Sequence, residues 1–233
     1  MAFLRAAFLF VALAGSGGPA LAADANASDW AAGLKSSARL IAGDSSQGRF
    51  HAGVEIKLAP GAITYWRSPG DAGLPPVLSF EGSQNLAQAH TLFPAPQRLN
   101  EGDGEAFGYD HSVIFPIDIE PIDPAKPVTV ALKLDYAVCE KICVPAKADL
   151  RLSLPSGAEP SPYADAIARA RALAPRPVEW ADLAGKADLA TLNDGLWRLC
   201  FAAPSGQPSL RRPVPFARRI ADRDRELRHW AAA

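Results

Sequence analysis

Cys139 and Cys143 are separated by three residues at the end of a strand-like run, and they are the side chains of this sequence best suited to do chemistry. An extended chain would hold their Cα atoms about 13 Å apart, whereas a disulfide needs about 4.4–6.8 Å, so pairing requires a turn at residues 140–142. Closing so short a loop contributes only about 2 kcal/mol to stability. Weak stabilisation and a turn prone to strain, with polar residues between the sulfurs, favour an exposed, reducible bond.

The spacing of the two cysteines leaves three interpretations open: a redox-active pair, a structural clip across a hairpin, and half of a metal site. Lys141 lies between the cysteines and could favour the thiolate by proximity. A zinc site would need further ligands, and only Cys200 and four histidines remain, none of them in a paired spacing. Cu(I) can use two thiolates, so copper binding stays an alternative. The sequence otherwise predicts no metal ligand and no cofactor.

The first residues have the composition of an export signal. Arg5 provides a positive charge, residues 6–14 are apolar, and Ala20-Leu21-Ala22 matches a cleavage site. We therefore predict a signal peptide over residues 1–22, cleaved after Ala22, and an exported chain whose thiols become disulfides. No later apolar run reaches spanning length, so we expect no transmembrane segment in the mature chain.

The composition argues against two classes of binding partner and is sufficient for a hydrophobic core. The formal net charge is only −1, which argues against nucleic acid or an anionic membrane surface as a partner. Because 48% of the residues are hydrophobic, the chain can bury a core of ordinary size. The length allows one domain with a smaller addition.

Residues 23–154 show short strands separated by turn residues. Arg49 to Leu58 alternates between apolar and polar positions, as a half-buried strand does. Further candidate strands are Ala62 to Trp66, Val77 to Phe80, Leu86 to Leu92, Ser112 to Ile119, Val128 to Tyr136 and Ala148 to Leu154. With no helical period between them, this pattern predicts an all-β fold, an immunoglobulin-like antiparallel β-sandwich. Pro116 falls inside a candidate strand and predicts an edge or a bulge there.

Residues 155–233 differ in character and predict a small, partly helical C-terminal extension. A linker over residues 155–162 precedes a short helix at Tyr163 to Ala174, and a strand is expected around Leu196 to Phe201. Cys200 is left without a partner, either as a buried residue or as a handle for an intermolecular bond. The arginine-rich tail from Ser209 is typical of a salt-bridged surface helix, with a docking segment as the alternative.

Four motifs follow one another between about Leu34 and Leu154. They are Tyr65-Trp66-Arg67-Ser68-Pro69-Gly70-Asp71-Ala72-Gly73-Leu74-Pro75-Pro76, Phe93-Pro94-Ala95-Pro96-Gln97-Arg98, Phe107-Gly108-Tyr109, and Tyr136 through Pro145 with both cysteines. Together they resemble the periplasmic N-terminal domain of the thiol:disulfide interchange protein DsbD and its relatives, including the copper-tolerance ScsB proteins.

The resemblance implies an exported, periplasmic thiol-disulfide interchange module with the activity of a protein-disulfide reductase. By motif position, Cys139 and Cys143 are the exchanging thiols, joined as a disulfide when oxidised, and Cys143 is expected to attack first. The implied partners are a membrane-embedded thiol reductant in trans and periplasmic thioredoxin-like or isomerase proteins. The implied roles are cytochrome c maturation, disulfide isomerisation or copper tolerance.

Family members also cover the cysteine pair with a loop. The candidate for that cap is the Gly- and Pro-rich segment from Ser68 to Pro76, including Pro69, Gly70 and Asp71, with an ordinary surface turn as the alternative. Tyr136 and Lys141 are predicted to modulate the pair. The competing functional hypothesis is a non-catalytic β-sandwich that binds a protein or copper, with the disulfide as a structural clip.

Overall fold

The computed structural model of the chain describes residues 24–70, 73–101, 104–177, 179, 181, 187–191 and 197–201. The chain divides into two compact units, with the boundary between Pro175 and Arg176. The predicted signal peptide, Asp71 of the candidate cap and the arginine-rich tail lie outside the described residues. In the part of the chain that is described, no helix is both long and apolar enough to cross a membrane.

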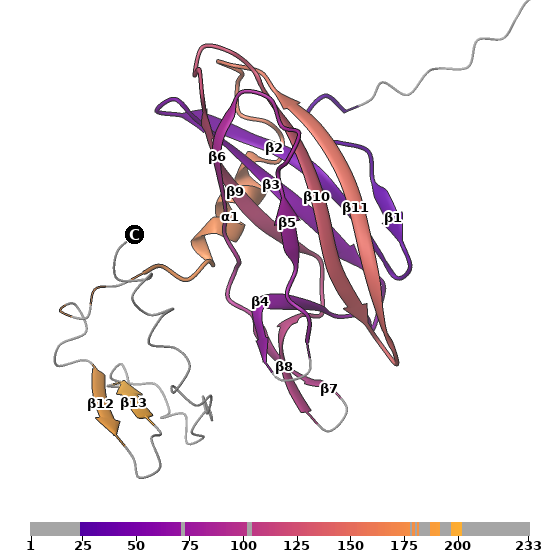
Figure 1. The fold of residues 1–233 in the computed structure, drawn as a ribbon, viewed down its shortest axis with the longest axis vertical. Helices are drawn as coiled ribbons and strands as arrows, with labels where there is room; N and C mark the ends of the chain where they lie inside the picture. Colours follow the sequence, from indigo (N-terminus) through magenta and orange to yellow (C-terminus); the bar gives the residue numbers. More distant parts are fainter. Residues whose placement is uncertain are drawn as a thin grey trace, which may run out of the picture. The chain divides into compact units, whose positions relative to one another are not determined.

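The first unit is a β-sandwich made of antiparallel sheets (Figure 1). One sheet has five strands in the order β1-β2-β3-β9-β6, and the sheet facing it has three in the order β11-β10-β5. A second three-stranded sheet has the order β4-β8-β7. The strands are β1 (Ala31–Gly33), β2 (Ser36–Ser46), β3 (Arg49–Leu58), β4 (Thr64–Gly70), β5 (Val77–Ser79), β6 (Leu86–Thr91), β7 (Gln97–Glu101), β8 (Gly104–Tyr109), β9 (Val113–Pro121), β10 (Val128–Cys139) and β11 (Cys143–Leu154).

Alternating side chains of the two large sheets form the core between them. The period-two pattern of β3 places Phe50, Ala52, Val54, Ile56 and Leu58 on one face. The first four are buried, and Leu58 at the end of the strand is partly buried. β9 and β10 also contribute buried side chains to this core, and Phe115 and Leu132 are each 1% exposed. The all-β sandwich predicted from the sequence is therefore confirmed.

The last residues of β10 depart from this alternation. Ala137, Val138 and Cys139 are all buried, although neighbouring strand residues should point to opposite faces. The inward face packs on the sandwich core, and the outward face is covered by the β4-β8-β7 sheet, which provides Tyr65 and Ala106. A small second core thus lies at the end of the sandwich where β10 turns into β11.

The predicted helix is α1 (Ala164–Ala172), and it packs on the five-stranded sheet. Its Ile167 is 1% exposed and lies against Gly53 of β3, where an added Cβ would come within 3.3 Å of the isoleucine Cγ1. Ile41 of β2, which is fully buried, lies beside the same glycine. The helix therefore belongs to the same compact unit as the sandwich.

The expectation for Pro116 was wrong, because β9 pairs with both β3 and β6 and is not an edge. The carbonyl of Pro116 accepts the N–H of Leu92 at 2.8 Å, so the backbone of this residue faces the β6 side. The paired residues of β6 and β9 end at Thr91 with Ile117, the residue next to Pro116. Proline has no N–H to donate to β3 or β6, and it is tolerated at position 116 because no donor is required at the end of the β6–β9 pairing.

The second unit contains a hairpin of β12 (Ala187–Thr191) and β13 (Trp197–Phe201). The strand predicted around Leu196 to Phe201 is thereby confirmed. Cys200 lies in β13 in register with Asp188.

Candidate functional site

A disulfide closes the hairpin between β10 and β11. Cys139 and Cys143 are the last register pair of these strands, and their Cα atoms are 4.0 Å apart with the sulfurs bonded. Residues 140–142 form the connection, as the spacing of the cysteines requires. The two half-cystines have opposite surroundings, since Cys139 is 2% exposed whereas Cys143 is exposed at the start of β11.

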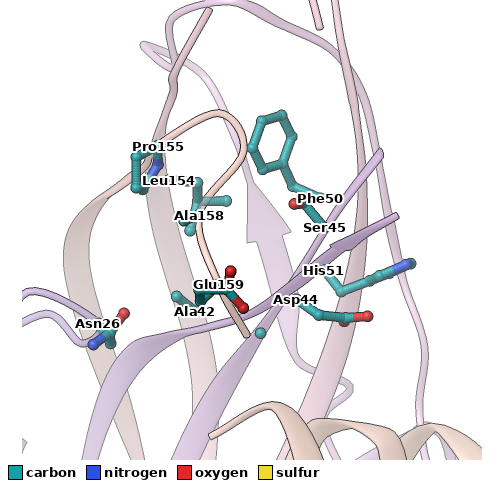
Figure 2. A pocket seen from close by; sticks show the side chains of 11 residues that line it. Asn26, Ala42, Asp44, Ser45, Phe50, His51, Leu154, Pro155, Ala158 and Glu159 are labelled. Atoms are coloured by element: carbon teal, nitrogen blue, oxygen red, sulfur yellow. The ribbon is translucent and has the colours of Figure 1, made fainter. Parts of the chain in front are cut away.

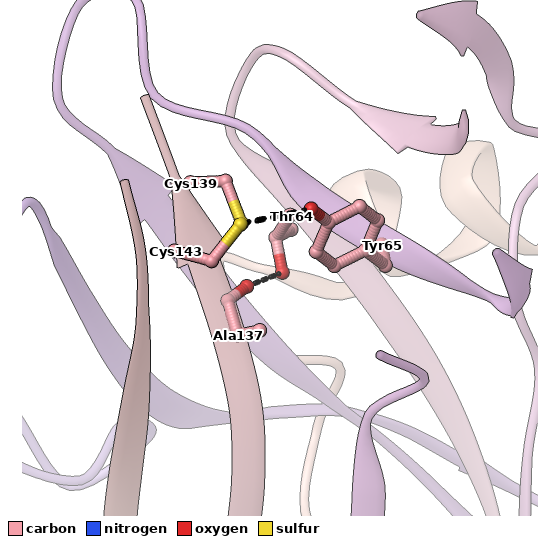
Figure 3. The surroundings of a disulfide bond; sticks show 5 residues. All are labelled: Thr64, Tyr65, Ala137, Cys139 and Cys143. Atoms are coloured by element: carbon pink, nitrogen blue, oxygen red, sulfur yellow. Dashed lines mark hydrogen bonds between the residues drawn. A yellow bond between two sulfur atoms is a disulfide. The ribbon is translucent and has the colours of Figure 1, made fainter. Parts of the chain in front are cut away.

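Cys139 is fixed from the side of β4. Its backbone N–H donates to Ile63 and its carbonyl accepts from the N–H of Ile63, at 3.0 and 2.8 Å. The Thr64 hydroxyl donates to the Ala137 carbonyl at 2.9 Å (Figure 3). These bonds hold the end of β10 against the start of β4, so the backbone of Cys139 is constrained independently of the disulfide.

The Tyr65 hydroxyl contacts the disulfide directly. It donates to the Cys139 Sγ at 2.8 Å and lies 3.5 Å from the Cys143 Sγ. Figure 3 shows the ring beside the bond, with its oxygen directed at the sulfur. Tyr65 is 1% exposed, so this polar contact lies in a nearly dry environment, where a hydrogen bond is stronger than in water.

Two glycines lie against Tyr65 and the backbone of its neighbour Thr64. A Cβ on Gly108, which pairs with Tyr65 across β4 and β8, would come 2.1 Å from the Thr64 carbonyl oxygen. A Cβ on Gly73 would come 2.4 Å from the Tyr65 ring and 2.6 Å from Pro69. Both residues belong to the motifs that carry the family resemblance. The close approach of Gly73 to the tyrosine ring and of Gly108 to the Thr64 carbonyl explains why glycine stands at each position.

The residues of the candidate cap lie close to Tyr65. Ser68, Pro69 and Gly70 form the end of β4, where Pro69 is buried and Ser68 is exposed. Gly70 has a φ of 88° and pairs with Ala106 of β8. Gly73, on the far side of the undescribed Asp71, packs on the ring of Tyr65. The segment thus lies against the tyrosine that contacts Cys139, and its role as a cap stays a prediction.

The other two candidate residues lie elsewhere. Lys141 is exposed at the hairpin turn, where its neighbour Glu140 forms an ion pair with Lys35 at 3.0 Å. The Tyr136 hydroxyl is 2.8 Å from the Ser36 hydroxyl, within the sandwich. Burial raises the pKa of Tyr136, so its phenol keeps its proton. The structure gives Tyr136 a structural hydrogen bond on the side of β2.

Sequence reasoning did not single out Tyr65 as a site residue. Tyr65 is the first residue of a motif, but its contact with a cysteine 74 positions away has no signature in local spacing. The signal was present in the motif itself, where an aromatic hydroxyl occurs at the start of a short strand.

Figure 2 shows a pocket at the end of β11 opposite the disulfide. It has a volume of about 20 Å³ and is lined by residues that include Phe50, His51 and Leu154. That volume suffices for about one water molecule. Among the described residues, no group of three or more His, Cys, Asp or Glu side chains is arranged to hold a metal ion.

The fold and the hairpin disulfide define a class: an immunoglobulin-like β-sandwich with a cystine at one end. The family described as the N-terminal region of the thiol:disulfide interchange protein DsbD matches residues 34–155. The match covers more than half of the sequence, and the chain belongs to this family. A search of curated proteins finds no match.

Two solved structures are similar to this chain. The N-terminal periplasmic domain of ScsB from Proteus mirabilis is 25% identical with a TM-score of 0.54, covering 65% of this chain and 60% of that chain. The chain therefore spans less than two thirds of that ScsB domain. The reduced N-terminal domain of DsbD from Neisseria meningitidis is 18% identical with a TM-score of 0.30, covering 49% of this chain and 82% of that chain. Family membership and the Cys139–Cys143 bond together support a thiol-disulfide interchange module.

Proposed function

We propose that this chain is an exported thiol-disulfide interchange module that relays electrons through Cys139 and Cys143 to partner proteins. The observation that carries the proposal is the asymmetry of the cystine, in which one half is buried and anchored and the other is exposed. A structural clip gains nothing from an exposed half, whereas exchange requires one sulfur that a partner can reach.

The chemistry follows from that asymmetry. In the reduced protein, the Cys143 thiolate attacks a sulfur of the partner's disulfide, and the partner's second sulfur leaves as a thiolate. The product is a mixed disulfide through Cys143. The Cys139 thiolate then attacks the Cys143 sulfur, the reduced partner leaves with the electron pair, and the Cys139–Cys143 bond is formed. Cys139 is suited to this second step because its backbone is already fixed beside Cys143.

We place this exchange in the periplasm, behind a signal peptide over residues 1–22, and we propose a membrane-embedded thiol reductant in trans as the electron donor. The proposed acceptors are thioredoxin-like or isomerase proteins, in cytochrome c maturation, disulfide isomerisation or copper tolerance. Support comes from the family and from the ScsB neighbour, whose matched domain is periplasmic.

Trapping of the mixed disulfide tests the proposal. A Cys139→Ala variant keeps the exposed Cys143 and lacks the resolving thiol, so it should accumulate conjugates on non-reducing gels that disappear with dithiothreitol. The matched control is Cys143→Ala, which keeps only the buried cysteine and should yield few conjugates. Both variants are made with Cys200→Ser as well, so that a conjugate through Cys200 is recognised.

Two results would contradict the proposal. In the first, neither variant forms a conjugate with any exported protein. In the second, every conjugate is lost when Cys200 alone is replaced. Either result would favour the competing hypothesis, a binding module for a protein or copper with Cys139–Cys143 as a clip.

A further inference from the structure

We propose that Tyr65 is a catalytic residue of the exchange: its hydroxyl stabilises the thiolate that forms on Cys139 when the disulfide opens. This inference rests on the proposed function and names the residue that acts on the buried sulfur. It is carried by the contact of the Tyr65 hydroxyl with the Cys139 Sγ, at 2.8 Å.

The geometry distinguishes the two sulfurs. The Tyr65 oxygen is 2.8 Å from Cys139 and 3.5 Å from Cys143, so the donor is placed on the sulfur that a partner cannot reach. When a partner thiolate attacks the exposed Cys143 Sγ, a new S–S bond forms there and the old bond breaks. The electron pair goes to the Cys139 Sγ, next to the donor.

The same donor acts in both directions. During reduction of the module, the Cys139 thiolate is the leaving group, and a leaving thiol of lower pKa leaves faster. During oxidation, the Cys139 thiolate is the attacking group, and the fraction present as thiolate is larger when the hydroxyl stabilises it. No acid or base has to be added, because Tyr65 keeps its own proton throughout.

The burial of Cys139 makes such a donor necessary. A thiolate at a site that is 2% exposed lacks water, and burial in apolar surroundings raises the pKa of a thiol. The cluster around Cys139 consists otherwise of Ala106, Ala137 and Ile63, whose side chains offer no hydrogen. Lys141 lies at the exposed turn, outside this cluster. A hydrogen bond to a charged acceptor in such an environment is among the stronger ones in proteins.

The placement of the ring is itself constrained. Gly73 lies so close to the ring that a Cβ would collide with it, and Gly108 of β8 lies so close to the backbone before Tyr65 that a Cβ would collide with the Thr64 carbonyl. The Thr64 hydroxyl ties the preceding residue to Ala137 of β10. The hydroxyl is thus held at the sulfur before the reaction begins, which is the arrangement that electrostatic stabilisation requires.

The first test measures the Cys139 thiol without any exchange. In the full chain with Cys143→Ala and Cys200→Ser, the pKa of Cys139 is followed by the ultraviolet absorbance of the thiolate or by alkylation rate against pH. Tyr65→Phe keeps the ring and removes the donor, so we expect the pKa of Cys139 to rise by about one unit or more. Tyr109→Phe is the matched control, because this buried tyrosine donates to the Pro94 carbonyl at 2.8 Å and contacts no sulfur.

The second test measures the reaction. With both cysteines present, reduction of the disulfide by dithiothreitol at pH 7 should be at least about tenfold slower in Tyr65→Phe than in the unmodified chain or in Tyr109→Phe. Thermal unfolding of each variant shows whether the fold is intact. If Tyr65→Phe unfolds, Tyr65→Leu, which also removes the donor, replaces it in both tests.

The outcomes separate this inference from the proposed function. An unchanged pKa of Cys139 together with an unchanged reduction rate in folded Tyr65→Phe overturns the role of Tyr65, whatever the trapping experiment shows. A raised pKa together with a failure to trap any partner supports the contact with Tyr65 and overturns the exchange function. A reduction rate that falls equally in Tyr109→Phe, with the pKa of Cys139 unchanged in Tyr65→Phe, shows a structural effect and overturns the inference.

Discussion

Cys139 and Cys143 share one bond but differ in every other respect. Cys139 belongs to a small apolar cluster and is bonded through its backbone to Ile63, whereas Cys143 begins an outer strand and is exposed. Tyr65 adds a chemical difference, since its hydroxyl donates to the buried sulfur. The reactivity of the pair is therefore set by the neighbours of each sulfur more than by the spacing of the cysteines.

Gly108→Ala should destabilise the region around Tyr65. The new Cβ would lie 2.1 Å from the Thr64 carbonyl oxygen, which is backbone and cannot move without breaking the β4–β8 pairing. Overpacking of this kind costs about 1–3 kcal/mol, and we expect the upper part of that range in urea unfolding. Gly33→Ala is the control, because the nearest atom to its Cβ would be the Ser36 hydroxyl at 3.3 Å. Equal loss in the two variants would contradict the assignment of Gly108 as a packing glycine.

At the scale of elements, the strands that were predicted from alternation are the ones with one face on the core. β3 was found with its bounds, and β4, β5, β6, β9, β10 and β11 were found with shifted ends. β2 was not singled out, because Leu40 and Ile41 are both buried and its two faces carry no contrast. β7 and β8 are short, and two glycines in β8 lower its strand propensity.

The site was predictable only in part, for a similar reason. The turn at residues 140–142 follows from the reach of the chain, so the hairpin of the two cysteines could be predicted from the sequence. The contact of Tyr65 with Cys139 could not, since it depends on β4 pairing with the end of β10 through Ile63 and Cys139. Pairings between strands distant in sequence are set by the whole fold.

The helix α1 should contribute to the stability of the sandwich unit through Ile167. That side chain is 1% exposed, and replacing a buried isoleucine with alanine costs about 2–5 kcal/mol. We expect a loss in this range for Ile167→Ala in urea unfolding. Leu173→Ala, at a residue that is 65% exposed just after the helix, should change stability by less than about 0.5 kcal/mol. Similar losses in both variants would mean that α1 does not dock as described.

The docking of α1 should also depend on pH through His51 of β3. Arg171 of the helix donates to the His51 Nδ1 at 2.7 Å and is paired with Asp118 of β9. Burial, with the nearby charge of Arg171, lowers the pKa of His51 from 6.5, against the opposite effect of Asp44. The folded state thus resists protonation of His51, and the unfolded state binds more protons below about pH 6.5.

Stability from this group is fully present above about pH 6.5 and is lost as the pH falls toward the lowered pKa of the folded state. We expect urea unfolding of the unmodified chain to lose more stability between pH 7.5 and 5.5 than that of His51→Gln, which cannot titrate. A pH dependence that is identical in the two proteins would show that His51 is not linked to folding.

At the scale of the molecule, a cystine lies at one end of the sandwich, and the loop that it closes is too short to stabilise the fold much. Closing that loop is worth about 2 kcal/mol, and the core between the large sheets does not depend on it. The disulfide lies in the unit that ends at Pro175, and this unit also contains the whole sandwich and α1. The redox state of the pair and the stability of the fold should therefore be nearly independent.

The reduction potential of the pair tests this independence. Equilibration with glutathione or dithiothreitol should give a value well above about −300 mV, below which structural disulfides typically lie. The Cys139→Ser, Cys143→Ser double variant should still unfold cooperatively, since only about 2 kcal/mol is at stake. A potential below that limit, with a bond inert to small thiols, would identify the cystine as a clip.

The exposure of only one half-cystine also constrains the order in which an electron donor and an electron acceptor can react with this chain. An electron donor and an electron acceptor that both react at the Cys143 sulfur must occupy the same surface, so the two cannot be bound productively at the same time. Turnover would then alternate strictly between two half-reactions, as in ping-pong kinetics, and an excess of either protein would occupy the wrong redox form and slow the other. The balance of the two partner concentrations, more than the affinity of either, would set the flow of electrons.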